Sequence, residues 1–180
     1  MNNVSSYRDY WQTQYKRVSK YRNEIWQHLD KYDLSHELFT KRPKENLWAI
    51  DEILRHMLAS EVAYIHQKFD SLASPKDFGV GAQWVGDYKL NMRELPHFAL
   101  NDIKKLSIDI KAKTHRYFED SKEEDFFKRV KAPWGEEMMF TDLLEAFYTH
   151  EAYHRGQVHY LMNLLGDTLG IKRKKFEQIK

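Results

Sequence analysis

The chain has 180 residues, 42% hydrophobic and 31% charged, a balance typical of one globular domain over residues 1–180 and too apolar for a disordered chain. Its net charge of +2 is too small to indicate nucleic acid or an anionic membrane as a partner. It has no cysteine, which excludes disulfide frameworks and iron–sulfur clusters, so a metal would need nitrogen or oxygen ligands. With no secretion signal or membrane-spanning run in the sequence, we expect a cytoplasmic protein.

Two amphipathic helices are expected in the first half of the chain. Apolar residues at seven- and four-residue spacings predict a helix over residues 5–32, and a second apolar stripe predicts one over 46–72. Residues 33–46 show no periodicity and form a connection. Residues 73–97 are rich in proline and glycine and predict a long loop, which is either a lid or pocket wall or a crossover between helices.

Two further helices are expected in the second half. One covers residues 100–121, and Ser121 with Glu124 matches a capping box that opens a short extra turn. The segment VKAPWGEEM is predicted to be a turn, and the last helix runs over 141–166 with Thr141 as its N-cap. Since no alternating strand pattern is present, the sequence predicts an all-α fold, an antiparallel four-helix bundle whose connection order is open.

The last helix carries His150 and His154, four residues apart. Because an α-helix has 3.6 residues per turn, these positions lie about 40° apart on one face, and both imidazoles can bind one ion. Phe147 and Leu161 belong to the same face, which predicts that the pair points into the bundle. A single buried histidine is usually satisfied by a hydrogen bond, but a pair at ligand spacing favours a metal.

A third ligand is expected from a facing helix. His56 lies on the buried stripe of the helix over 46–72, whereas His66 lies on a different face. Ser60 and Ala63 continue the face of His56, and such small side chains would leave room for a substrate beside the ion. The expected ligands are therefore His56, His150 and His154.

The string HEAYH at residues 150–154 also matches the zinc-protease pattern, in which Glu151 would be the general base. The metzincin extension requires a glycine and a histidine where this chain has Gln157 and Tyr160. The other zincin pattern needs a glutamate well downstream of the motif, and the only acid left there lies in the basic tail. A protease is therefore disfavoured, and Glu151 is expected to form a surface ion pair with Arg155 four residues later.

Three motifs together resemble the DinB/YfiT-like family of metal-dependent proteins: LRHMLASE at residues 54–61, PWG at 133–135, and HxxxHRGQ at 150–157. The resemblance covers about residues 48–166. It implies a four-helix bundle with unusual connectivity, often dimeric, with zinc, nickel or a similar ion on three histidines. By position these are His56, His150 and His154. Characterised members of the family include thiol-dependent S-transferases, a thiol-dependent isomerase and proposed hydrolases.

Other residues near these motifs have either functional or structural explanations. Gln157 lies almost in line with His150, where it would orient a ligand or a bound water, or be a core amide. Arg155 points away from the metal face and Gly156 suits the close approach of another helix, so both are expected to be structural. Trp134 and Trp84 would border the pocket or simply pack.

Three functions follow from this site. A metal on neutral imidazoles favours an anionic ligand such as hydroxide or thiolate. The first function is what the family resemblance implies, an enzyme that activates a low-molecular-weight thiol for S-transfer to a small-molecule substrate. The second is a hydrolase that uses metal-bound water. The third is a non-catalytic bundle stabilised by metal. Gln157 and Glu151 are the candidate catalytic residues, and a homodimer is expected from the resemblance.

Overall fold

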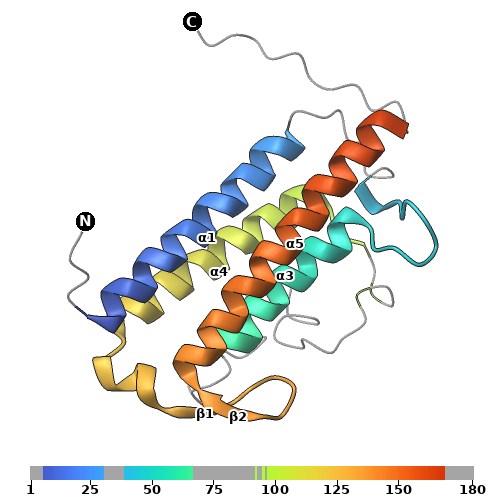
Figure 1. Ribbon diagram of the computed structural model, residues 1–180. Helices are drawn as coiled ribbons and strands as arrows, with labels where there is room; N and C mark the ends of the chain where they lie inside the picture. The colour runs from blue at the N-terminus through green and yellow to red at the C-terminus, as the bar shows by residue number, and fades with distance from the viewer. Residues whose placement is uncertain (1–5, 31–38, 67–91, 93–94, 96, 169–180) are drawn as a thin grey trace, which may run out of the picture.

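The computed structural model describes residues 6–30, 39–66, 92, 95 and 97–168. In these residues four long helices form a bundle, which confirms the predicted all-α fold (Figure 1). They are α1 (Tyr7–Leu29), α3 (Ile50–Ile65), α4 (Leu100–Asp120) and α5 (Phe140–Thr168). Most of the predicted loop over 73–97, including Trp84, lies outside the described residues.

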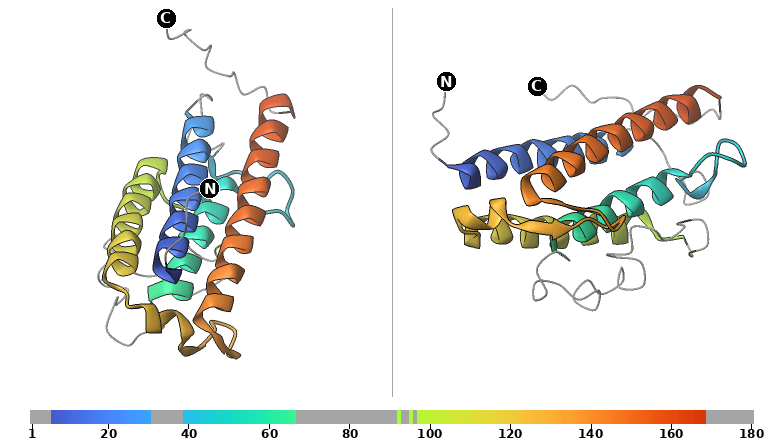
Figure 2. Two further views of the ribbon diagram at one scale, coloured as in Figure 1. Left: turned by 60° about the vertical axis from the view of Figure 1, so that its left-hand side comes forward. Right: turned by 60° about the horizontal axis from the view of Figure 1, so that its bottom comes forward.

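The bundle is only partly antiparallel. Around it the helices follow the order α1, α5, α3, α4, and each packs against the next. Helices α1 and α5 run in one direction and α3 and α4 in the other (Figures 1 and 2). Since α3 and α4 run parallel, the last residue of α3 and the first residue of α4 lie at opposite ends of the bundle (Figure 1). This is the crossover that the sequence left open.

The helix ends depend on capping groups that an apolar stripe does not reveal. Helix α1 begins where the Ser6 hydroxyl accepts a hydrogen bond from the Asp9 amide at 3.1 Å. Helix α3 begins where the Glu52 carboxylate accepts from the Ala49 amide at 2.7 Å. Both helices therefore begin later than the predicted ranges 5–32 and 46–72, and the last residues of those ranges, 31–32 and 67–72, lie outside the described residues. No helix in the described parts of the chain is long and apolar enough to cross a membrane.

The segment predicted to be only a turn is a β-hairpin. Strands β1 (Arg129–Lys131) and β2 (Glu137–Met139) pair antiparallel, with Val130 opposite Met138. Gly135 lies in the connecting loop at a φ of 102°, and its amide donates to the Ala132 carbonyl at 2.8 Å. The strands were missed because three residues are too few to show an alternating pattern.

Two predicted caps are also wrong. The short helix η4 (Glu123–Phe127) is capped at its N-terminus by Asp125, whose carboxylate accepts a hydrogen bond from the Lys122 amide at 2.9 Å. The Ser121 hydroxyl does not cap this helix but donates to the Tyr117 carbonyl. Helix α5 begins at Phe140 rather than after Thr141, because the hairpin leads directly into its first turn.

The apolar core consists of two clusters separated by a polar layer. The cluster towards the C-terminal end of α5 includes Ile25, Leu29, Ile53, Met57, Ile103, Leu106, Val158 and Leu165. The cluster next to the hairpin includes Trp11, Tyr15, Phe118, Phe126, Phe140 and Phe147. Between them each of the four helices contributes a buried polar residue: Arg22, Glu61, Thr114 and Glu151. The three predicted ligands lie at this level of α3 and α5.

Candidate metal site

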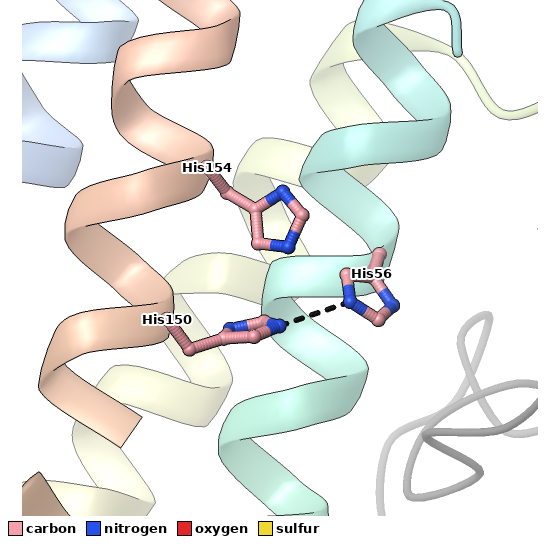
Figure 3. Close-up of side chains that lie close together, drawn as sticks. All are labelled: His56, His150 and His154. Carbon is pink, nitrogen blue, oxygen red and sulfur yellow. Dashed lines mark hydrogen bonds between the residues drawn. The ribbon is translucent and has the colours of Figure 1, made fainter. Parts of the chain in front are cut away.

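Three imidazoles converge between α3 and α5. His56 projects from α3 toward His150 and His154, which lie on successive turns of α5 (Figure 3). One nitrogen from each ring lies within 4.8 Å of the other two, and the Nε2 atoms of His56 and His150 are 3.0 Å apart. Two ligands at about 2.1 Å from one ion lie at most about 4.2 Å apart, so nitrogens within 4.8 Å of one another need only a small movement of the rings to share an ion. The cluster is therefore of a size that could bind a metal ion.

All three imidazoles are neutral at neutral pH. Burial and the neighbouring His154 lower the pKa of His56 to about 4, and burial with both other histidines lowers the pKa of His150 to about 3. Burial also lowers the pKa of His154, although its hydrogen bond to Gln157 partly opposes this effect. A neutral imidazole presents the lone pair that a metal requires, so no proton has to be displaced at pH 7.

Gln157 fixes the orientation of His154. Its Oε1 accepts a hydrogen bond from His154 Nδ1 at 2.7 Å, which leaves His154 Nε2 as the acceptor nitrogen. This nitrogen faces the other two rings (Figure 3). The sequence placed Gln157 in line with His150, whereas the contact is to His154, three residues earlier on the same helix. Such a hydrogen bond is a common support for a metal-binding histidine.

Glu151 faces away from the histidine cluster. Its carboxylate accepts hydrogen bonds from Arg22 of α1, at 3.0 Å to Nε and 2.8 Å to Nη2, and it is only 4% exposed. The predicted surface pair with Arg155 is wrong, because Arg155 pairs with Glu24 at 3.1 Å. The geometry also removes the basis for the protease interpretation, since a general base would have to face the ion.

Arg22 is shared by two buried carboxylates with opposite pKa shifts. Burial raises the pKa of Glu151, and Arg22 only partly opposes this effect. Burial also acts to raise the pKa of Glu61, but Arg22 together with hydrogen bonds from Thr114 and Tyr15 lowers it overall. Glu61 has two additional donors that Glu151 lacks, which explains the difference.

A pocket of about 510 Å³ opens beside His154. Its walls come from α5, from the first turn of α3 and from the segment before it, and comprise Asn46, Leu47, Trp48, Ile53, Tyr153, His154, Gln157, Tyr160 and Leu161. The Trp48 ring lies edge-on to His56 at 5.0 Å and parallel to His154, with 6.3 Å between ring centroids. The pocket therefore adjoins the histidine cluster through His154 and Trp48.

The predicted pocket residues Ser60, Ala63 and Trp134 are not among those that line this pocket. The Ser60 hydroxyl is 3.5 Å from His150 Nε2 but fully buried, and Ala63 belongs to the apolar cluster next to the hairpin. Trp134 packs on Tyr64, which lies between it and His150. A Cβ built on Gly156 meets no described atom within 4 Å, so no close helix approach occurs there.

Sequence reasoning missed Arg22 and three residues of the pocket wall. Arg22 occupies an apolar position of α1, three residues before Ile25 and four after Val18, and a charge on such a stripe is a recognisable signal. Tyr153 and Tyr160 lie seven residues apart on α5, and a repeated exposed aromatic is a weaker signal. Trp48 precedes the first turn of α3 and carried no signal, because its position depends on tertiary structure.

Comparisons with known proteins agree with this description. The sequence model of the DinB family matches residues 1–173. No curated protein matches the chain significantly. The fold is similar to the crystal structure of a DinB-like protein, YjoA, from Bacillus subtilis, with a TM-score of 0.58 and 17% sequence identity over 87% of this chain and 94% of that one. From the family match and its residues, the chain belongs to the DinB family.

Proposed function

We propose that the protein is a metal-dependent transferase that activates a low-molecular-weight thiol and transfers its sulfur to an electrophilic small molecule. The observation that carries this proposal is the position of His154, which belongs both to the three-imidazole cluster and to the wall of the pocket. A site that served only to stabilise the bundle would not need an adjoining pocket. The DinB family match supports the same function by analogy.

The residues of the chain fit a divalent ion such as zinc or nickel. Three neutral nitrogen donors suit either metal, and they leave the charge of the ion uncompensated, which favours an anionic fourth ligand. When bound, the ion would lower the pKa of a coordinated thiol or water and so supply a nucleophile at neutral pH. His56, His150 and His154 would hold the ion, and the hydrogen bond to Gln157 would keep His154 in the required tautomer.

In the proposed reaction the thiol loses its proton to solvent at the pocket mouth, since the three imidazoles are occupied as ligands. The sulfur then forms a bond to an electrophilic carbon of the substrate, and the leaving group departs with the electron pair of the broken bond. The walls around Trp48 hold the substrate against the histidine cluster and exclude part of the water. Positioning is thus the main contribution of the protein side chains.

Hydrolysis of an ester or amide is the second candidate. It would use the same three imidazoles and the same pocket. The observation that favours it is the Ser60 hydroxyl, 3.5 Å from His150 Nε2, because a hydroxyl there can hold a water molecule beside the cluster. The two reactions differ in whether a thiol is consumed.

Metal content and thiol dependence test both candidates. Elemental analysis of tag-free protein is expected to find about one divalent ion per chain. The His56→Ala and His154→Ala variants are expected to lose it, whereas His115→Ala on α4 retains it. Turnover of 1-chloro-2,4-dinitrobenzene with cysteine or glutathione would then identify the transferase, and turnover of p-nitrophenyl acetate without thiol would identify the hydrolase. Wild-type protein that stays metal-free after reconstitution with zinc and nickel would overturn both.

A further inference from the structure

The pocket beside His154 has walls with two exposed tyrosines. Tyr153 and Tyr160 are each 63% exposed, although most aromatic residues of the described chain are buried or half-buried. They lie two turns apart on one side of α5 and line the same concavity as Trp48. Exposed aromatic side chains that converge on a concave surface are typical of a ligand site, whereas a single exposed tyrosine needs no explanation.

The segment that carries Trp48 is fixed before a ligand binds. Arg42, which precedes it, donates to the Glu52 carboxylate from Nε at 3.1 Å and from Nη2 at 2.5 Å. The same carboxylate accepts from the Ala49 amide, which follows Trp48. Trp48 therefore lies between two points that are anchored on one buried glutamate. A preformed aromatic wall loses little conformational entropy on binding.

The described walls of the pocket carry no charge. None of its nine lining residues is Asp, Glu, Lys or Arg, in a chain of which 31% of residues are charged. The side-chain polar groups are the Asn46 amide, the tyrosine hydroxyls, the Trp48 indole N–H, His154, and Gln157, whose carbonyl already accepts from His154. A charged group that entered this space would lose water without gaining an opposite charge, which is unfavourable.

From these walls we infer that the pocket selects substrates that carry a flat aromatic group and no charge of their own. The aromatic group would lie against Trp48 and between the side chains of Tyr153 and Tyr160, with its reactive end toward the histidine cluster. Charge would come only from the ion and its anionic ligand. The inference rests on the proposed function for the reaction, but binding to these walls does not depend on it.

Three ligands with one aromatic body and different charges test the inference. They are 2-naphthamide, 2-naphthoate and 2-naphthylmethylammonium, and their affinities would be measured by equilibrium dialysis. The full chain is used as purified and again after chelation, because a bound ion would itself attract the carboxylate. In the chelated protein 2-naphthamide is expected to bind about tenfold more tightly than either charged ligand. Equal or tighter binding of a charged ligand overturns the inference, whatever the metal content.

Variants of Tyr160 test whether the ligand binds at these walls, and they leave the three histidines unchanged. Tyr160→Ala is expected to weaken 2-naphthamide binding about tenfold, and Tyr160→Phe to retain most of it, because the ring supplies the contact. Tyr10→Ala, at a 39% exposed tyrosine of α1, is the control and is expected to change nothing. Unchanged affinity in Tyr160→Ala would overturn the inference. If the protein binds no metal but both sets of affinities are as expected, the inference about the pocket is supported and only the proposed reaction is wrong.

Discussion

Arg22 of α1 holds Glu151 of α5 through two parallel hydrogen bonds, at 3.0 Å and 2.8 Å, in the middle of the bundle. Glu151 directly follows His150 in the chain. The pair therefore fixes the rotation of α5 at the level where that helix presents two of the three imidazoles. Arg22 also pairs with Glu61 of α3, so one guanidinium connects both helices that carry the cluster.

Removal of Arg22 is expected to destabilise the protein severely. In Arg22→Met two buried carboxylates lose their shared cation, and breaking a buried ion pair in this way costs about 3–5 kcal/mol. Urea denaturation measures the free energy of unfolding. The exposed Arg17→Met on the same helix is the control and should change it by less than about 0.5 kcal/mol. Similar losses in the two variants would show that the network contributes little.

Gln157 is expected to act on metal affinity more than on stability. Gln157→Leu removes the acceptor that orients His154, and loss of such a support typically weakens metal binding about 10- to 100-fold. Gln157→Glu retains an oxygen acceptor and should stay closer to wild type. Competition with a chromophoric chelator measures the affinity, and urea denaturation of metal-free protein is the parallel readout. Equal affinities of Gln157→Leu and wild type would contradict the assigned role.

Metal-free protein is expected to lose stability as the pH falls from about 6.5 toward 4. In this window the unfolded chain protonates histidines at an ordinary pKa of about 6.5, while His56 and His150 stay neutral in the folded state because their pKa values are about 4 and about 3. The unfolded state thus binds more protons, and acid favours unfolding. The lowered pKa of Glu61 acts with the same sign only below about pH 4.5.

Urea denaturation of chelated protein at pH 7.5, 6.0 and 5.0 measures this dependence. The raised pKa of Glu151 acts with the opposite sign, so wild type alone does not isolate the histidines. The comparison is therefore with His150→Asn, which is expected to show a shallower fall in the free energy of unfolding. An identical fall in both proteins would mean that His150 is not held neutral.

The same substitution at two glycines is expected to have opposite effects. Gly135→Ala forces an alanine to a φ of 102°, and this strain should destabilise the protein by about 1–2 kcal/mol although no atom obstructs the new methyl group. Gly156→Ala replaces an exposed helical glycine with space around it, and should stabilise by up to about 1 kcal/mol. Thermal unfolding of both variants measures the difference. A stabilised Gly135→Ala would contradict the backbone assignment.

The sequence by itself determined the features that depend on neighbouring residues. Helical periodicity is local, so the four helices and the all-α fold were predictable from apolar spacing. The convergence of His150 and His154 follows from 3.6 residues per turn and needs no tertiary structure. His56 lies on the apolar stripe of another helix, which made it the expected third ligand. The packing of α3 against α5 brings its Nε2 atom to 3.0 Å from that of His150.

Tertiary structure alone decided which groups face one another across the bundle. The sequence paired Glu151 with Arg155, because a residue four positions away is the nearest visible partner. The structure pairs it instead with Arg22, 129 positions away, since α1 packs beside α5. Trp48 and Tyr160 form one pocket for the same reason, since they meet only after α3 has docked on α5. Such contacts depend on the relative rotation of whole helices, which local spacing does not specify.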